Sequence, residues 1–124
     1  RIGANFTFTD RLEHRLLAGA DFLLMPSLYE PCGLTQMRAQ RYGANPIARR
    51  VGGLADTIED EVTGYLFDEY SPAGFDRAVR RALALFADQP ARATYAREAM
   101  TRDFDWTHSA ARYLAAYQRA LAAR

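Results

Sequence analysis

The chain contains no lysine and only one cysteine. Its 124 residues carry 16 basic side chains, all arginine, and 15 acidic ones, so the formal net charge is only +1. So small a charge creates no long-range field that would gather nucleic acid or an anionic membrane, and we expect neither as a partner. Any phosphate that this chain binds must be held without a lysine ammonium group.

Other absences narrow the class of protein further. The single cysteine, Cys32, excludes an intrachain disulfide bond, so a reducing cytoplasm is the default location. Two histidines and one cysteine offer no metal-ligand spacing, and we expect neither a metal nor a cofactor. No apolar run approaches the roughly 20 residues that cross a bilayer. The opening residues resemble neither a signal peptide nor a regular domain start, so we expect a domain that is incomplete on its N-terminal side.

The apolar pattern predicts alternating helices and strands in the first part of the chain. The short apolar run 22–25 is typical of a strand buried on both faces of a parallel sheet. The other predicted elements are a weak strand end at Ile2, Phe6 and Phe8, helices at 10–19, 34–42 and 54–59, and strands at 45–50 and 63–67. We expect Gly43 to end the second helix as a left-handed C-cap. This order predicts an α/β fold with a doubly wound, Rossmann-like parallel sheet, present in part.

Only helices are predicted from residue 72 onward, at 73–87, 90–100 and 107–124. Phe75, Val79, Leu83 and Phe86 form the apolar stripe of the first, and Thr107 is a plausible N-cap for the last. We therefore expect one domain over residues 1–124, of which 72–124 is helical. Aromatic residues near the C-terminus are expected to pack the last helix, with a sugar-stacking platform as the alternative; they are Phe104, Trp106, Tyr113 and Tyr117.

The loop at residues 27–36 follows a predicted strand, where open α/β sheets bind their ligands. Gly33, Leu34 and Thr35 are predicted to form the first turn of the next helix. Free N–H groups and the helix dipole suit a diphosphate there, and the Thr35 hydroxyl can add a donor. Glu30 lies slightly upstream, where its carboxylate could contact a sugar and favour positive charge at its anomeric carbon. A solvated glutamate before a turn proline is the alternative.

These residues also carry a family resemblance. Residues 30–36 read Glu-Pro-Cys-Gly-Leu-Thr-Gln, after Leu-Met-Pro-Ser at 24–27 and before Tyr42-Gly43 and the segment Gly-Gly-Leu-Ala-Asp-Thr at 52–57. The chain closely resembles bacterial glycogen synthase and plant starch synthase, over nearly its whole length. The likeness includes Asp-Phe-Asp-Trp at 103–106, before the last helix. So long an ordered match is more specific than a lone glycine-rich motif.

The resemblance implies the C-terminal domain of a GT-B glycosyltransferase, an enzyme with two Rossmann-like domains. It implies glucose transfer from ADP-glucose to the non-reducing end of an α-1,4-glucan, with retention and without a metal. The N-terminal domain of the same enzyme is then a partner. Residue by residue, Glu30 matches the active-site glutamate, Phe8 an aromatic residue against adenine, and His14 a helix histidine. The donor-contacting run is matched by Cys32, Gly33, Leu34 and Thr35.

Several alternatives stay open. A non-catalytic or truncated relative would keep the fold and bind ADP weakly. Another nucleotide-sugar transferase would be expected to carry a second glutamate where Arg38 stands. A Cys32 nucleophile with His14 as its base has no orienting third group in the sequence. Glycines 52 and 53 either approach a ligand or form a tight turn. The pair Arg49-Arg50 is expected to be solvated, with contact to phosphate or glucan as the alternative.

Overall fold

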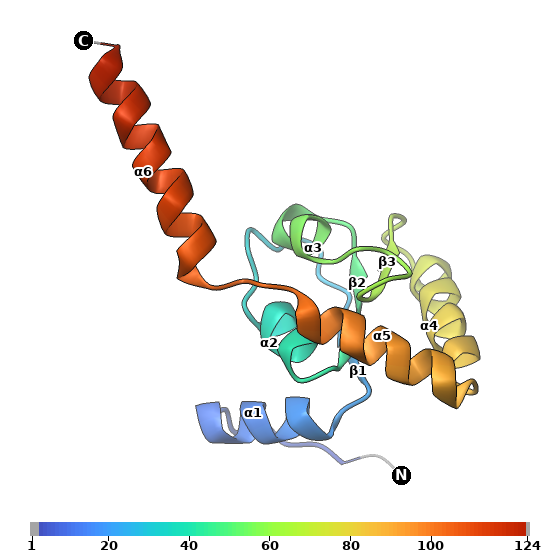
Figure 1. Ribbon diagram of the computed structural model, residues 1–124. Coiled ribbons are helices and arrows are strands. Elements are labelled where there is room, and N and C mark those ends of the chain that lie inside the picture. The colour runs from blue at the N-terminus through green and yellow to red at the C-terminus, as the bar shows by residue number, and fades with distance from the viewer. Residues whose placement is uncertain (1–2, 124) are drawn as a thin grey trace.

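The computed structural model describes residues 3–123 as a small parallel sheet with helices on both faces (Figure 1). The strands are β1 (Phe22–Met25), β2 (Asn45–Arg49) and β3 (Tyr65–Phe67), in the order β1-β2-β3. The helices are α1 (Asp10–Gly19), α2 (Thr35–Arg41), α3 (Gly52–Thr57), α4 (Pro72–Phe86), α5 (Gln89–Thr101) and α6 (Trp106–Ala122). The predicted α/β class, with parallel strands and C-terminal helices, is confirmed.

Parallel pairing brings the carboxyl ends of the strands to one edge. Met25 at the end of β1 pairs with Ala48 of β2, and Arg49 pairs with Phe67 at the end of β3. The loop after β1 and the start of α3 after β2 therefore meet at this edge. This is the edge where parallel α/β sheets bind ligands.

Each face of the sheet buries its own cluster of apolar side chains. On one face, Ile47, Tyr65 and Phe67 pack against Ala78 and Ala82 of α4. On the other face, Ala48 and Leu66 pack against Leu54 of α3 and against Ile58, which follows this helix. The predicted stripe on α4 is partly wrong, because its Leu83 is 56% exposed. The two alanines instead let the helix lie close to the sheet.

Some predicted boundaries and environments are corrected. Phe6 and Phe8 lie in an irregular segment and not in a strand, while Ile2 lies outside the described residues. Leu24 is 55% exposed because β1 is an edge strand of the described sheet, so β1 is not buried on both faces. Helix α3 begins at Gly52 and not at residue 54. Gly43, with φ of 80°, ends α2 as predicted.

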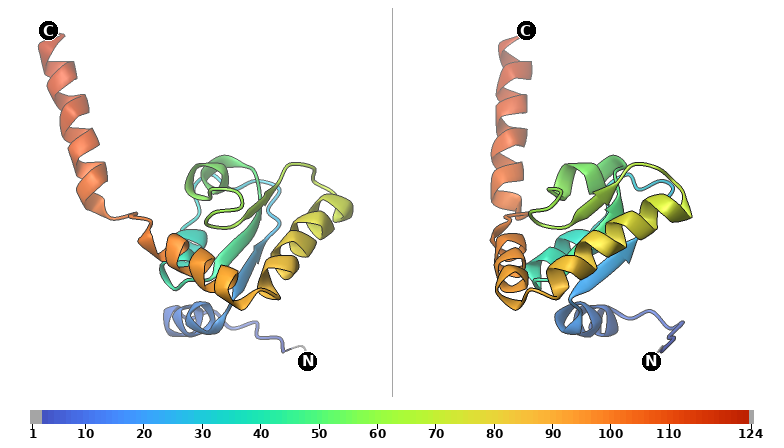
Figure 2. Two further views of the ribbon diagram at one scale, coloured as in Figure 1. Left: turned by 45° about the vertical axis from the view of Figure 1, so that its right-hand side comes forward. Right: turned by 90° about the vertical axis from the view of Figure 1, so that its right-hand side faces the viewer.

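Helix α6 extends away from the rest of the domain (Figures 1 and 2). It has no buried residue, and its N-cap is Asp105, whose carboxylate accepts from the Thr107 N–H at 2.6 Å. The expected packing of the C-terminal aromatic residues is therefore wrong within residues 3–123: Trp106 is 77% exposed and Tyr117 62%. No helix in this range is both long and apolar enough to cross a membrane.

Candidate functional site

The loop between β1 and α2 is fastened through its own carbonyl groups. Arg49 Nη1 donates to the carbonyl of Leu28 at 2.8 Å, and the Gly53 N–H donates to that of Glu30 at 3.2 Å. The side-chain amide of Gln36 donates to the carbonyl groups of Cys32 and Gly33, both at 2.9 Å. Three elements, β2, α3 and α2, thus fix the conformation of one loop.

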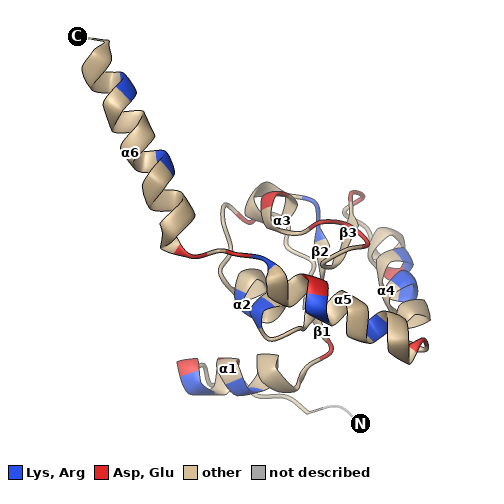
Figure 3. Cartoon of the chain, viewed as in Figure 1, with Lys and Arg blue, Asp and Glu red and all other residues tan. Residues whose placement is uncertain are grey.

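The two arginines differ in their exposure. Arg50 is exposed, as expected, although it is ion-paired, whereas Arg49 is half-buried. The guanidinium group of Arg49 lies 4.9 Å from the centre of the Tyr70 ring, in addition to its contact with the loop. Arg50 forms ion pairs with Asp60 at 3.3 Å and Asp68 at 2.9 Å. Figure 3 shows that acidic and basic residues are interspersed over much of the domain.

Glycines 52 and 53 make room for the loop. A Cβ atom at Gly52 would overlap the carbonyl oxygen of Glu30, and one at Gly53 would overlap that of Cys32. Gly52 also has φ of 43°, which favours glycine. Both glycines therefore serve a close approach between two backbone segments, which the sequence alone did not indicate.

Helix α2 begins beside the loop with free backbone donors. It starts at Thr35, with Leu34 as an N-cap that makes no side-chain hydrogen bond. Gly33 lies before the helix and not in its first turn, with φ of 73°. Within residues 3–123, no group accepts a hydrogen bond from the N–H of Gly33, Leu34 or Thr35. These donors can bind an anion, as expected for a helix start.

The Thr35 hydroxyl is engaged by a residue that sequence reasoning missed. It donates to Glu13 Oε1 at 3.1 Å, while Arg38 Nη1 lies 2.7 Å from Glu13 Oε2. The Glu13 side chain is only 11% exposed, so its charge needs this compensation. Arg38 therefore neutralises a carboxylate beside the free N–H groups. No local signal pairs Glu13 with Thr35, because the contact depends on how α1 packs against α2.

A cavity of about 370 Å³ connects two of the predicted site residues. It lies between residues 5–9, α1, β1 and the start of α2, and both Phe8 and Thr35 line it. Its other walls are mainly apolar, with Leu12, Leu16 and Leu23 among them. The volume is in the range of small-molecule pockets, and an aromatic side chain beside free N–H donors suits a ring joined to phosphate.

His14 and Cys32 do not join this cavity. The Nδ1 atom of His14 is 3.0 Å from the hydroxyl of Tyr42, at the far end of α2 from Thr35. Seven residues of helix rise by roughly 10 Å, so the two ends of α2 are well separated. Cys32 is exposed and makes no hydrogen bond to His14. A Cys–His catalytic pair is therefore absent.

Glu30 lies in the anchored loop with its carboxylate free. The residue is half-buried, and its carboxylate forms no hydrogen bond or ion pair with any group in residues 3–123. Its backbone is fixed by α3, as described above, whereas its side chain remains available to a ligand.

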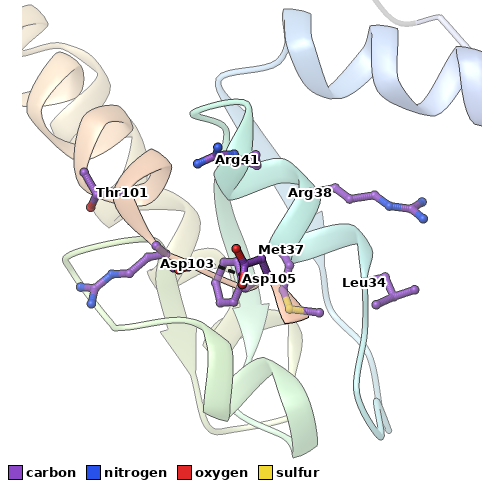
Figure 4. Close-up of a pocket in the computed structure, with 9 residues that line it drawn as sticks. Leu34, Met37, Arg38, Arg41, Thr101, Asp103 and Asp105 are labelled. Atoms are coloured by element: carbon purple, nitrogen blue, oxygen red, sulfur yellow. Dashed lines mark hydrogen bonds between the residues drawn. The ribbon is translucent and has the colours of Figure 1, made fainter. Parts of the chain in front are cut away.

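A larger cavity, of about 630 Å³, lies elsewhere around α2 (Figure 4). It is lined by residues of α2 and by 101–105, and Leu34 is the one predicted site residue among them. Its arginines are already engaged: Arg41 donates to the Met100 carbonyl at 3.2 Å, and Arg102 pairs with Glu59. Volume alone therefore does not identify the functional site.

A parallel sheet with an anchored loop and free helix-start donors at its carboxyl edge defines an α/β domain of the Rossmann type. The chain belongs to the family of glycosyl transferases group 1, whose model matches residues 1–100.

Within this family, the chain is similar to glycogen and starch synthases. It is 49% identical to a glycogen synthase of Pseudomonas fluorescens over 123 residues, 98% of this chain and 23% of that protein. It is 46% identical to that of Thermodesulfovibrio yellowstonii over 118 residues, 95% of this chain and 24% of that protein. The catalytic domain of Arabidopsis thaliana starch synthase IV, bound to ADP and acarbose, matches with a TM-score of 0.87 and 35% identity, over 94% of this chain and 26% of that one.

The resemblance to glycogen and starch synthases is confirmed by these matches, as is the GT-B domain type. The chain spans about a quarter of the length of the relatives that it matches.

Proposed function

We propose that this chain forms the donor side of an enzyme that transfers glucose from ADP-glucose to the non-reducing end of an α-1,4-glucan, with retention of configuration. The observation that carries the proposal is the cavity lined by both Phe8 and Thr35, because Thr35 is also one of the three consecutive residues with free N–H groups, 33–35. The similarity to glycogen synthases and to a starch synthase bound to ADP and acarbose supports it.

In the proposed donor site, two different surfaces contact the two ends of ADP. The adenine ring lies against Phe8 in the apolar cavity, and the diphosphate accepts from the N–H groups of Gly33, Leu34 and Thr35. The backbone of Cys32 borders this run, so its conformation matters more than its thiol. Thr35 contributes its N–H group, because its hydroxyl donates to Glu13. His14 supports the site indirectly, by fastening α1 to α2 through Tyr42.

Glu30 is the proposed catalytic residue. As the bond from the anomeric carbon to the diphosphate breaks, positive charge develops on the sugar ring. A carboxylate without an intramolecular partner can interact with the sugar hydroxyls and with this developing charge. The proposal needs no covalent enzyme intermediate. The charge on the departing diphosphate requires more than helix-end dipoles, which are worth about 0.3 to 1 kcal/mol each, so we expect further cationic groups from another part of the enzyme.

The N-terminal domain of the same enzyme is the proposed partner. Helix α6 presents exposed apolar side chains to solvent, Trp106, Tyr113, Leu114, Tyr117 and Leu121. So large an apolar surface on a protruding helix is typical of a docking surface. The acceptor glucan would bind between the two domains, in the cytoplasm.

Arg38 favours this branch of the family over other nucleotide-sugar transferases. A glutamate at that position would put a second negative charge beside Glu13, next to the proposed diphosphate site. The arginine instead forms an ion pair with Glu13 at 2.7 Å.

A nucleotide titration followed by NMR tests the donor site. We expect ADP to bind the isotopically labelled chain weakly and to shift the backbone amides of Gly33, Leu34 and Thr35 together with signals of Phe8. Phe8→Ala should reduce binding of ADP without altering the shifts caused by inorganic diphosphate. Shifts concentrated around the larger cavity at residues 101–105 would contradict the proposed site.

A further inference from the structure

We propose that Gln36 is a positioning residue that holds the loop at residues 30–35 in its reactive conformation and couples it to helix α3. The expected loss of turnover rests on the proposed function, whereas the contacts of Gln36 are seen in the structure itself.

The side chain of Gln36 is fully buried at 0% exposure, although it is polar. Its Nε2 atom donates to the carbonyl groups of Cys32 and Gly33 and to the hydroxyl of Thr57, the last at 3.1 Å. Two of these acceptors belong to the loop. The amide therefore turns the carbonyl groups of residues 32 and 33 inward, so the N–H groups of the same peptide units, those of residues 33 and 34, face the opposite way.

Thr57 extends this network to the start of α3. Its hydroxyl donates to the carbonyl of Gly53 at 2.5 Å, and the N–H of Gly53 in turn donates to the carbonyl of Glu30. The contacts thus form a continuous chain of hydrogen bonds from Gln36 through Thr57 and Gly53 to the backbone of Glu30. One buried amide fixes both the donor-binding segment and the backbone that carries the proposed catalytic carboxylate.

The packing of Gly33 indicates that this residue does more than stabilise the core. The Oε1 atom of Gln36 is buried without a hydrogen-bond partner, which disfavours folding, but Gln40 shares this feature, so it does not distinguish the two residues. Gly33 packs directly on the amide, since a Cβ atom there would lie 2.8 Å from Gln36 Cδ. A residue with a side chain at position 33 would therefore clash with the amide, so the turn can pack here only with glycine.

Gln40 provides a matched control. It lies one turn further along α2, is also 0% exposed and also has an unpartnered Oε1 atom. Its Nε2 atom donates to the carbonyl of Thr57 at 3.0 Å and makes no hydrogen bond to the loop. Methionine at either position keeps the side-chain length and removes the donor. The two variants should therefore disturb folding similarly, and only one should disturb the loop.

The first experiment measures amide hydrogen exchange in the 124-residue chain. Gln36→Met should accelerate exchange across residues 30–35 and 52–54 by at least tenfold relative to Gln40→Met, at matched global stability. Equal exchange in the two variants would overturn the proposal. Should Gln36→Met not fold, Thr57→Val serves as the second variant, with the same expected pattern and the same contradicting result, and Thr57→Ser should restore protection.

The second experiment measures glucosyl transfer in the full-length protein. Gln36→Met should lower kcat by tenfold or more relative to Gln40→Met, beyond any change in KM for ADP-glucose. A kcat equal to that of Gln40→Met would contradict a positioning role. If the wild type transfers no glucose, the proposed function fails, whereas the exchange comparison still decides whether Gln36 positions the loop.

Discussion

Glu30 is the single residue on which the proposed chemistry depends most. Its carboxylate has no partner in the described part of the chain, while its backbone carbonyl accepts a hydrogen bond from the N–H of Gly53. Glu30→Gln in the full-length protein should therefore lower kcat by about 100-fold or more, the scale seen when one electrostatic group in an active site is removed. Binding of ADP should change little, because the carboxylate acts mainly on the sugar in the transition state.

Cys32→Ser is the matched control for this prediction. Its thiol is exposed and its main contact is made by its backbone carbonyl, so the variant should retain substantial activity. Steady-state rates with ADP-glucose and glycogen, together with ADP affinity by calorimetry, separate the two effects. Near wild-type turnover in Glu30→Gln would remove Glu30 from the mechanism, and loss of turnover in a folded Cys32→Ser protein would return the thiol to it.

Tyr65 provides a pH test of the core. Burial raises the pKa of Tyr65 to about 12 from an ordinary value near 10, and nearby Tyr95 and Glu61 act in the same direction. The folded state thus retains a phenolic proton that the unfolded state loses, so the free energy of unfolding should fall as the pH rises from 10 to 12. The full effect is on the order of 3 kcal/mol at 1.36 kcal/mol per unit.

Urea unfolding at pH 9, 10, 11 and 12 measures this loss. Tyr65→Phe keeps the ring and removes the ionisable group, so its alkaline loss should be smaller than that of the wild type. Identical pH profiles for the two proteins would show that another group is responsible.

At the scale of whole elements, the positions of most helices and strands could be predicted from local sequence. Apolar runs, caps and the C-cap glycine at residue 43 are short-range signals, and they placed most elements to within a residue or two. The exposure of Leu24 and the roles of Gly52 and Gly53 could not be found in this way. Each depends on which segments meet in three dimensions.

In the candidate site, too, local features could be predicted from the sequence, whereas contacts between distant segments could not. The motif around Glu30 and Gly33 was recognisable because its residues are contiguous. The cavity between Phe8 and Thr35, and the part played by Glu13, are formed by the packing of α1 against α2, which no periodicity encodes. His14 was predicted from family position alone, and its role in donor binding stays a prediction; in the structure its Nδ1 atom lies 3.0 Å from the Tyr42 hydroxyl.

The contact between α3 and the loop gives a prediction at this scale. A Cβ atom at Gly53 would overlap the carbonyl oxygen of Cys32, so Gly53→Ala should lower the free energy of unfolding by about 1–3 kcal/mol through overpacking. It should also weaken ADP binding, because the loop must shift. Gly19 is the control, since nothing lies within 4 Å of a Cβ atom built there.

Chemical denaturation and an ADP titration of both variants check this prediction. Gly19→Ala should be neutral or slightly stabilising, as expected for alanine in place of a helical glycine. A Gly53→Ala protein as stable as the Gly19→Ala protein would mean that the loop is not held as described.

At the scale of the whole molecule, the proposed function gives this chain one side of a site that needs two. Orientation of donor, acceptor and charged groups can contribute roughly 7 to 11 kcal/mol to lowering a reaction barrier. In the proposed function the acceptor glucan also needs the N-terminal domain, and the 124-residue chain contains no lysine. It should therefore show no measurable glucosyl transfer, even with its motif intact. Release of ADP from ADP-glucose in the presence of glycogen, compared with a buffer blank, measures this, and turnover like that of an ordinary enzyme would refute the two-sided account.

The central claim is that these residues form a competent donor side of a glucan synthase. The most direct test is a chimera in which this chain replaces the corresponding segment of the Thermodesulfovibrio yellowstonii glycogen synthase, with which it shares 46% identity. Incorporation of labelled glucose from ADP-glucose into glycogen is the measurement. We predict transfer by the chimera and its loss on Glu30→Gln. A chimera that unfolds cooperatively and binds ADP but transfers no glucose would contradict the account.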